Sequence, residues 1–178
     1  MTWPPERSRD GGVDRLPLPE GVAGSLWLCG KHWIGPDWER AQRELDADVV
    51  VCLCHGHEMA ERYPSYVSWL QSPSGPLAAH WVPVHDLHAP APEQAVEMAD
   101  TVVGHLQAGR TVVIHCGAGI GRAGTVAAAV LMRLGRSRLE AVAEVAAARP
   151  LAGPEVGAQS DLLAHLEGLD GFGADERG

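Results

Sequence analysis

The stretch that decides the fold is TVVIHCGAGIGRAGT, residues 111–125. Its first four residues are all β-branched, a composition typical of a strand that is covered on both faces of a sheet. A Gly-rich loop follows, and an Ala/Val-rich helix then runs to about Leu134. A strand, a loop and a helix in this order predict a parallel α/β sheet, whose ligands bind beyond the carboxyl ends of the strands.

The segments on either side alternate in the same way between strand-like and helix-like patterns. The run 48–54 (DVVVCLC) is continuously apolar after its first residue, so we expect it to form a central buried strand. Together the segments predict an α/β fold with a single domain and a mostly parallel central sheet flanked by helices. The predicted strands are 25–29, 48–54, 80–84 and 111–114; the predicted helices are 36–45, 58–70 with an interruption at Pro64, 93–106, 122–134, one capped by Ser137 and Glu140 and ended by Pro150, and 155–169.

Length, composition and charge narrow the possible classes of protein. The chain has 178 residues, 46% hydrophobic and 21% charged, which fits one globular domain over 13–170 with flexible segments at 1–12 and 171–178. A net charge of −9 disfavours nucleic acids and anionic membranes as partners. The longest apolar run, 126–132, is far shorter than the ~20 residues of a membrane-spanning helix, and no secretory signal is apparent. We therefore expect a soluble, cytoplasmic protein.

The loop after residue 114 carries groups suited to binding an anion. Its glycines allow successive backbone N–H groups to point into one concavity, and the following helix adds its own unpaired N–H groups and the positive end of its dipole. A cradle of this kind has the size of a phosphate group. The residues predicted to line it are Gly117, Ala118, Gly119, Ile120, Gly121 and Arg122.

Three residues predict phosphoryl chemistry at this cradle. Cys116 begins the loop, where the N–H groups and Arg122 would lower the pKa of its thiol below the usual ~8.5 and produce a nucleophilic thiolate. Arg122 offers a planar fork for two oxygens of a transferring phosphoryl group. Asp86 lies just past a predicted strand and is our first choice for the acid that protonates the leaving oxygen, although His85 and His88 flank it and are alternatives.

The pattern His115-Cys116-x5-Arg122 resembles the signature of the cysteine-dependent protein tyrosine phosphatase superfamily, and Asp86 upstream resembles its dual-specificity, atypical branch. The resemblance covers roughly residues 25–166. It implies a cysteinyl-phosphate intermediate on Cys116, phosphate binding by Arg122 and the loop amides, and Asp86 as acid and then base. It also makes Gln159 a candidate for positioning the attacking water, and it implies no metal and no organic cofactor. The implied partners are phosphorylated proteins, on tyrosine, serine or threonine, or small phosphate esters.

One departure from the family pattern concerns turnover. The family commonly has Ser or Thr directly after the arginine, where a hydroxyl stabilises the departing thiolate, and this chain has Ala123. We expect slow hydrolysis of the phosphoenzyme, unless Thr125 or a water substitutes in part. The alternative is a phosphate-binding pseudophosphatase module with little or no turnover.

Other interpretations of the same residues are less favoured. A rhodanese-like sulfurtransferase also holds a cysteine in an anion-binding loop, and in low-molecular-weight phosphatases and arsenate reductases the acid follows the motif, the reverse of the order here. The pattern Cys52-x-Cys54-His55-x-His57 matches no common zinc site, so we expect buried cysteines and loop histidines. Cys54 is a possible redox partner of Cys116. His115 is expected to support the loop by hydrogen bonding rather than to shuttle protons.

Overall fold

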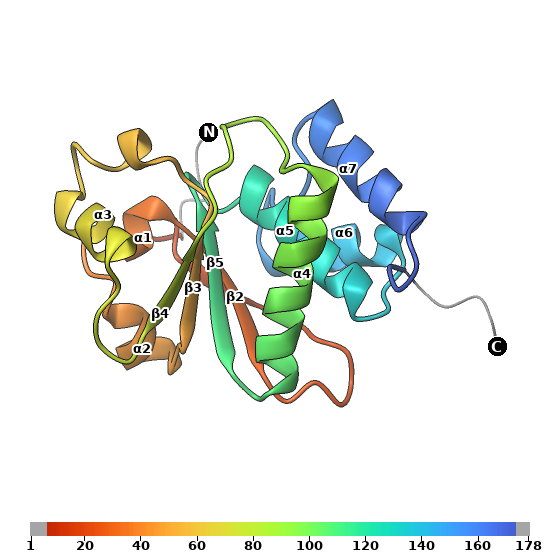
Figure 1. Cartoon of the computed structure of the whole chain (residues 1–178), viewed down its shortest axis with the longest axis horizontal. Coiled ribbons are helices and arrows are strands. Elements are labelled where there is room, and N and C mark those ends of the chain that lie inside the picture. The colour runs from red at the N-terminus through yellow and green to blue at the C-terminus, as the bar shows by residue number, and fades with distance from the viewer. Residues whose placement is uncertain (1–6, 174–178) are drawn as a thin grey trace.

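A computed structural model describes residues 7–173, and Figure 1 shows a central sheet between two groups of helices. The five strands lie in the order β1-β2-β5-β3-β4, parallel except for β1, which is antiparallel to β2. This arrangement confirms the predicted α/β fold with a mostly parallel sheet. The strands are β1 (Val13–Leu16), β2 (Ser25–Gly30), β3 (Val49–Cys52), β4 (Ala78–Trp81) and β5 (Thr111–Cys116).

The helices form one layer on each face of the sheet. In Figure 1 the first three helices lie on one side and the last four on the other, with α5 running next to β5. The bounds are α1 (Lys31–Ile34), α2 (Arg40–Leu45), α3 (Pro64–Gln71), α4 (Pro92–Gln107), α5 (Gly121–Arg133), α6 (Arg138–Ala148) and α7 (Gly157–Glu167), with a 3-10 turn at Gly56–Glu58. None of the helices within residues 7–173 is long and apolar enough to cross a lipid bilayer.

The position of β5 places the decisive loop at the centre of the molecule. This strand lies between β2 and β3, and all its residues after Thr111 are buried. The register sets Gly30 beside Cys116 and Cys52 beside His115, so the carboxyl ends of three strands meet at one edge. A side chain at Gly30 would approach the carbonyl oxygen of Gly117 within 2.9 Å, so glycine is required for the close approach of the two segments.

Several element boundaries differ from the sequence-based prediction for local reasons. Pro64 does not interrupt a helix but begins α3, since a first-turn residue needs no backbone N–H. The helix predicted from residue 36 begins only at Arg40, and α1 follows β2 directly in a segment where no helix was predicted. Strand β1 was not predicted, because its sequence VDRL is short and half polar. The capping box of Ser137 and Glu140 at the start of α6 is confirmed.

Parts of the two predicted flexible segments contact the rest of the domain. Arg149 donates to the carbonyl oxygens of Gly11 and Gly12, both at 3.3 Å, so these two residues lie against the domain. At the other end Phe172 is buried and lies under the guanidinium of Arg133. Residues 1–6 and 174–178 of those segments lie outside the described part of the chain.

Candidate active site

The cradle loop, residues 116–122, joins the end of β5 to the first turn of α5. Gly119 has a φ of 74°, and a Cβ at this position would collide with the carbonyl group of Cys29, so only glycine fits. The backbone N–H groups of Ile120 and Ala123 donate hydrogen bonds to the Cys116 thiol. The loop therefore curls around the sulfur with backbone donors directed inward, as the glycine pattern predicts.

Arg149 braces this loop from outside. Its side chain is fully buried, and its guanidinium donates to the carbonyl oxygens of Gly119 at 2.8 Å and Ala118 at 2.7 Å. Its remaining nitrogen, Nη1, donates to Asp14 Oδ2 at 2.5 Å. Because these carbonyls are held on the outer side, the N–H groups of the adjoining peptides are directed to the inner side. Sequence reasoning missed this role, which no local pattern marks.

Arg122 is held across the cradle by Glu58. The two side chains form a bidentate pair, with both N···O distances 2.8 Å, and Arg122 Nη1 also donates to the carbonyl oxygen of Val84 at 2.8 Å. Its Nη2 lies 3.2 Å from the position that a Cβ on Gly117 would take. Among the described residues nothing accepts a hydrogen bond from the buried Arg122 Nε, so this donor remains for a ligand such as a phosphate oxygen.

Glu58 is a site residue that the sequence analysis missed. It ends a capping box that starts at His55, whose backbone N–H donates to Glu58 Oε1 at 2.8 Å. Burial would raise the pKa of this carboxyl, but the hydrogen bonds from Arg122 and His55 outweigh it and lower the pKa below its usual value. Lys31 donates to the carbonyl oxygen of Glu58 at 2.8 Å. The capping pattern after β3 is the sequence signal that could have identified this residue.

Asp86 lies in the acid loop, which we define as residues 85–89. Its Oδ1 is 3.2 Å from Arg122 Nη2, and 72% of the side chain is exposed. It lines a cavity of about 350 Å³ together with Cys116 and Arg122, so the structure brings the three predicted catalytic residues together. His85 and His88 are not among the described residues that line this cavity, and His88 Nδ1 instead binds the carbonyl oxygen of Asp86 at 2.8 Å.

The supporting residues predicted from sequence have other partners near the site. Buried Gln159 accepts from the N–H of Glu155 at 2.8 Å and donates to the carbonyl oxygen of His88 at 3.1 Å, so it ties the acid loop to the segment before α7. Thr125 donates its hydroxyl proton to the Gly121 carbonyl oxygen at 2.7 Å. His115 is fully buried, with its Nε2 2.7 Å from the hydroxyl of Tyr66. Each side chain thus fixes backbone or core geometry in this conformation.

The ionisation of Cys116 differs from the sequence-based expectation. Burial and the nearby Cys54 raise the pKa of the Cys116 thiol above its ordinary value, against the lowering effect of the loop N–H groups and Arg122. The sequence predicted a lowered pKa because it showed the arginine and the loop N–H groups but not the burial of the sulfur. In the structure the charge of Arg122 is shared with Glu58, which reduces its effect on the sulfur.

The remaining cysteines are buried free thiols. Cys54 follows β3, and its carbonyl oxygen accepts a hydrogen bond from Trp81 Nε1 at 2.8 Å. Interaction with Cys52 and burial raise the pKa of Cys54 well above its ordinary value, which makes it a protonated thiol at neutral pH. Within residues 7–173 no three His, Cys, Asp or Glu side chains are grouped so that they could hold a metal ion.

The rim of the cavity carries charges of both signs. Lys31 and Arg9 supply positive charge, while Asp10 and Glu155 supply negative charge. The carboxylate of Glu155 lies beside Gly121, in the space that a Cβ there would need. The cradle therefore binds its anion beside a mixed rim rather than within a wholly basic surface.

Comparison with known proteins agrees with this geometry. The family model described as "Polymorphic toxin system, DSP-PTPase phosphatase" matches residues 43–136, a range that includes β3, β5, the cradle loop and the acid loop. No curated relative matches the chain. The family match therefore covers more than half of the sequence and every predicted catalytic residue.

Solved structures of phosphatases share the fold. The active form of Tk-PTP has 28% identity and a TM-score of 0.62, over 82% of this chain and 91% of that one. A glycine-to-alanine mutant form of Tk-PTP has 32% identity and a TM-score of 0.59, over 74% and 83%. Kinase associated phosphatase, with its catalytic cysteine replaced by serine, has 19% identity and a TM-score of 0.71, over 89% and 97%. Human DUSP28 has 20% identity and a TM-score of 0.62, over 86% and 92%.

Proposed function

The chain belongs to the DSP-PTPase phosphatase family, and from this premise we propose that it hydrolyses phosphate monoesters through a cysteinyl-phosphate intermediate. The observation that carries the proposal is the shared cavity of Cys116, Arg122 and Asp86. A nucleophile, an anion cradle with an unpaired Arg122 Nε–H, and an acid line the same cavity. An in-line displacement at phosphorus needs this arrangement.

In the first step Cys116 loses its thiol proton to water, and the resulting thiolate attacks phosphorus while the bond to the ester oxygen breaks. Asp86, protonated at the start, gives its proton to the departing oxygen, which leaves as an alcohol or phenol. The N–H groups of the cradle loop and the guanidinium of Arg122 bind the three remaining phosphate oxygens, where negative charge is concentrated in the transition state. The product of this step is a phosphate group bonded to sulfur.

In the second step water attacks the phosphorus of this intermediate. The Asp86 carboxylate accepts a proton from the water, the bond from sulfur to phosphorus breaks, and the thiolate and inorganic phosphate are released. Gln159 is our candidate for positioning the water, through its hold on the acid loop at His88. The reaction needs no metal and no organic cofactor.

The cavity favours substrates with a single phosphate. No lysine lies within the cradle loop, and the positive charges of Lys31 and Arg9 on the rim are matched by acidic residues. We infer that the substrates are phosphotyrosine, phosphoserine or phosphothreonine in proteins, or small phosphate esters. We further infer that the protein acts in the cytoplasm without nucleic acid or membrane partners.

A second candidate is a module that binds phosphate groups with little turnover. Ala123 supplies no hydroxyl to the departing thiolate, and the hydroxyl proton of Thr125 is bound to Gly121. These two observations weaken the second chemical step and leave binding intact. The module would hold a phosphorylated partner in the cradle for longer than a fast enzyme does.

Hydrolysis of p-nitrophenyl phosphate by the wild type and by Cys116→Ser separates the two candidates. The enzyme should release nitrophenol, and the serine variant should lose this activity while still binding vanadate or phosphate, because the cradle is unchanged. Absence of turnover in both proteins, with phosphate binding retained, would favour the binding module. Activity that survives in Cys116→Ser would remove the proposed mechanism.

A further inference from the structure

Two histidine rings connect the acid loop to the segment that holds Arg122. The rings of His55 and His85 are stacked, with centroids 4.2 Å apart and an angle of 27° between their planes. His85 directly precedes Asp86, and His55 is the first residue of the capping box that ends at Glu58. The stack therefore joins the two sides of the catalytic cavity outside the cavity itself.

From this stack a continuous set of contacts leads to the catalytic residues on both sides. On one side, the His55 N–H binds Glu58, which holds Arg122 by two hydrogen bonds. On the other side, Asp86 follows His85 in the chain and reaches Arg122 at 3.2 Å. The stack thus contributes to the distance between the acid and the arginine, together with the hydrogen bond from Arg122 to the carbonyl oxygen of Val84.

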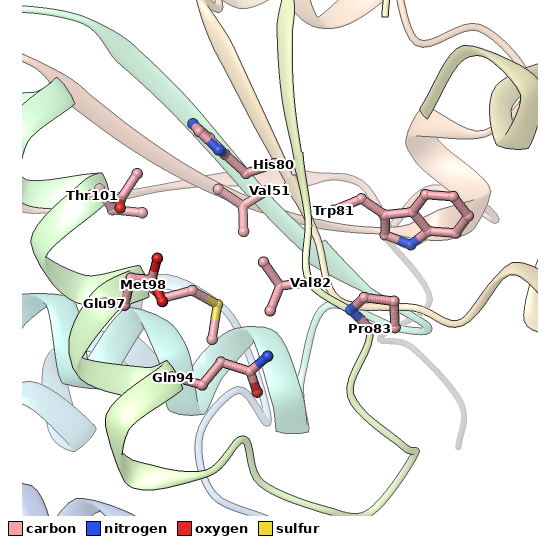
Figure 2. Close-up of a pocket in the computed structure, with 10 residues that line it drawn as sticks. Val51, His80, Trp81, Val82, Pro83, Gln94, Glu97, Met98 and Thr101 are labelled. Atoms are coloured by element: carbon pink, nitrogen blue, oxygen red, sulfur yellow. The ribbon is translucent and has the colours of Figure 1, made fainter. Parts of the chain in front are cut away.

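The rest of the acid loop has few other supports. Its stem passes a cavity of about 300 Å³, where Val82 and Pro83 stand opposite Gln94 and Met98 of α4 (Figure 2). A cavity of this size leaves the stem without close packing on that side. Beyond the stem, Leu87 is exposed and has a φ of 58°, a conformation that costs a branched side chain free energy. Contacts at the ends of the loop must therefore position it.

We propose that His85 is a positioning residue, whose stack on His55 holds the acid loop so that Asp86 meets Arg122 over the cradle. The inference rests on the proposed function, since it concerns the acid of that reaction. Of the other contacts, the bond from Gln159 to the carbonyl oxygen of His88 holds the far end of the loop, and the bond from Arg122 to the carbonyl oxygen of Val84 holds the backbone just before His85. The stack adds the side-chain contact at the near end, next to the acid.

The stack also gives the acid loop a dependence on pH. The ring of His57 lies 5.4 Å from that of His55, and the ring of His88 lies 5.9 Å from that of His85. Burial, His85 and His57 lower the pKa of His55, Glu58 raises it by less than these, and Arg122 lowers it further.

His55 is therefore neutral at pH 7, and the stack is intact. Because the interaction with His85 lowers the pKa of His55, protonation of His55 at lower pH weakens the contact between the two rings. The acid loop should then separate from the segment that carries Glu58.

Leaving groups of different quality report the position of the acid. In His85→Ala, kcat for phenyl phosphate should fall by about 3- to 10-fold, the effect expected from loss of one ring pair, with KM unchanged. The fall with p-nitrophenyl phosphate should be smaller, because nitrophenolate leaves without much help from an acid. His85→Phe keeps a flat ring and should recover most of the activity. His57→Ala, which removes a neighbouring ring from outside the acid loop, is the matched control and should leave the ratio of the two substrates unchanged.

The pH dependence of kcat separates a positioning role of His85 from a purely structural one, which would leave this dependence unchanged. Below pH 6 the wild type should lose kcat for phenyl phosphate more steeply than His85→Phe, because a phenylalanine ring does not oppose a positive charge on His55 as His85 does. An equal fall of kcat with both substrates in His85→Ala would overturn the proposal. So would a His85→Phe variant that recovers no activity and loses kcat at low pH as steeply as the wild type.

Amide hydrogen exchange over residues 84–88 tests the stack without any turnover. Protection should fall in His85→Ala and should return in His85→Phe at the same pH. If the wild type proves to have no phosphatase activity, this measurement still decides the positioning role, so the two failures are distinguishable. Unchanged exchange in the alanine variant would show that the stack does not hold the loop.

Discussion

The cradle loop is held by backbone contacts and one buried arginine, whereas the acid loop opposite it is held by side-chain contacts at an exposed surface. The cradle loop continues a central strand, and its shape is fixed by glycines and by Arg149. The acid loop passes a cavity and is held at its ends by a ring stack and by Gln159. The phosphate-binding geometry is thus formed before the substrate binds. The position of the proton donor depends instead on weak contacts that a substitution or a change of pH can alter.

The largest expected effect is on stability and comes from removing the contacts of Arg149 with the cradle loop. Arg149→Met removes a fully buried charge that binds two loop carbonyls and Asp14, and leaves these acceptors without their donor. We expect the free energy of unfolding to fall by about 3–5 kcal/mol, as when one partner of a buried ion pair is removed. Urea unfolding followed by tryptophan fluorescence measures the change.

The control for this variant is Arg138→Met. Arg138 pairs with Glu167 at 2.9 Å, but both side chains are about two-fifths exposed, so its loss should cost at most about 1 kcal/mol. If the two variants unfolded at the same urea concentration, Arg149 would not brace the cradle as its contacts indicate.

The acid side should respond in activity and not in stability. Asp86→Asn cannot donate a proton to the leaving oxygen, so kcat for phenyl phosphate should fall by about 10²- to 10³-fold, with a smaller fall for p-nitrophenyl phosphate. Phosphate binding should persist, since the asparagine keeps the size of the side chain and the cradle is untouched. His88→Asn tests the flanking alternative, and a larger loss in that variant than in Asp86→Asn would assign the acid to His88.

The same contrast explains how much could be predicted from the sequence. The strand, loop and helix around residue 116 are adjacent in the chain, so their chemistry is visible as one pattern. Glu58 and Arg149 act through contacts with residues 64 and 30 positions away, and no short pattern shows which partner a charged residue will find. The sequence therefore showed the nucleophile, the arginine and the acid, but neither residue that holds the cradle in shape.

The fold shows the same limit. Strand β1 forms only because Val13 to Leu16 pair with β2, and its four residues show no clear alternation of apolar and polar side chains. At Pro64 the sequence was ambiguous, because a proline ends one helix as readily as it begins another. The pKa of Cys116 was misjudged for a related reason: burial, the largest cause of its rise, comes from packing with distant segments.

Glu58 holds Arg122 between the cradle loop and the acid loop, and removing its negative charge should change the pKa of the Cys116 thiol. In Glu58→Gln the charge of Arg122 is no longer shared, so the pKa of Cys116 should fall. A thiolate forms as the pH rises through the thiol pKa. Alkylation of Cys116 by iodoacetamide should therefore begin at a lower pH in the variant than in the wild type. In the wild type the raised pKa of Cys116 shifts the reaction to higher pH. Glu44→Gln, at an exposed pair with Arg40, should leave this profile unchanged, and an identical profile for Glu58→Gln would show that the pair does not control the thiol.

The smallest expected effect concerns the second chemical step, hydrolysis of the cysteinyl-phosphate in the cradle loop. Ala123 is buried at the start of α5, and its N–H already donates to Cys116, so a hydroxyl at this position lies beside the sulfur. In Ala123→Ser a hydrogen bond to the departing thiolate should raise the steady-state rate by about 10-fold, while the initial burst of product stays the same. Stopped-flow measurement of nitrophenol release separates the two phases. Thr125→Val should leave both phases unchanged, because that hydroxyl binds the Gly121 carbonyl. A serine variant no faster than the wild type would mean that loss of the hydroxyl does not limit turnover.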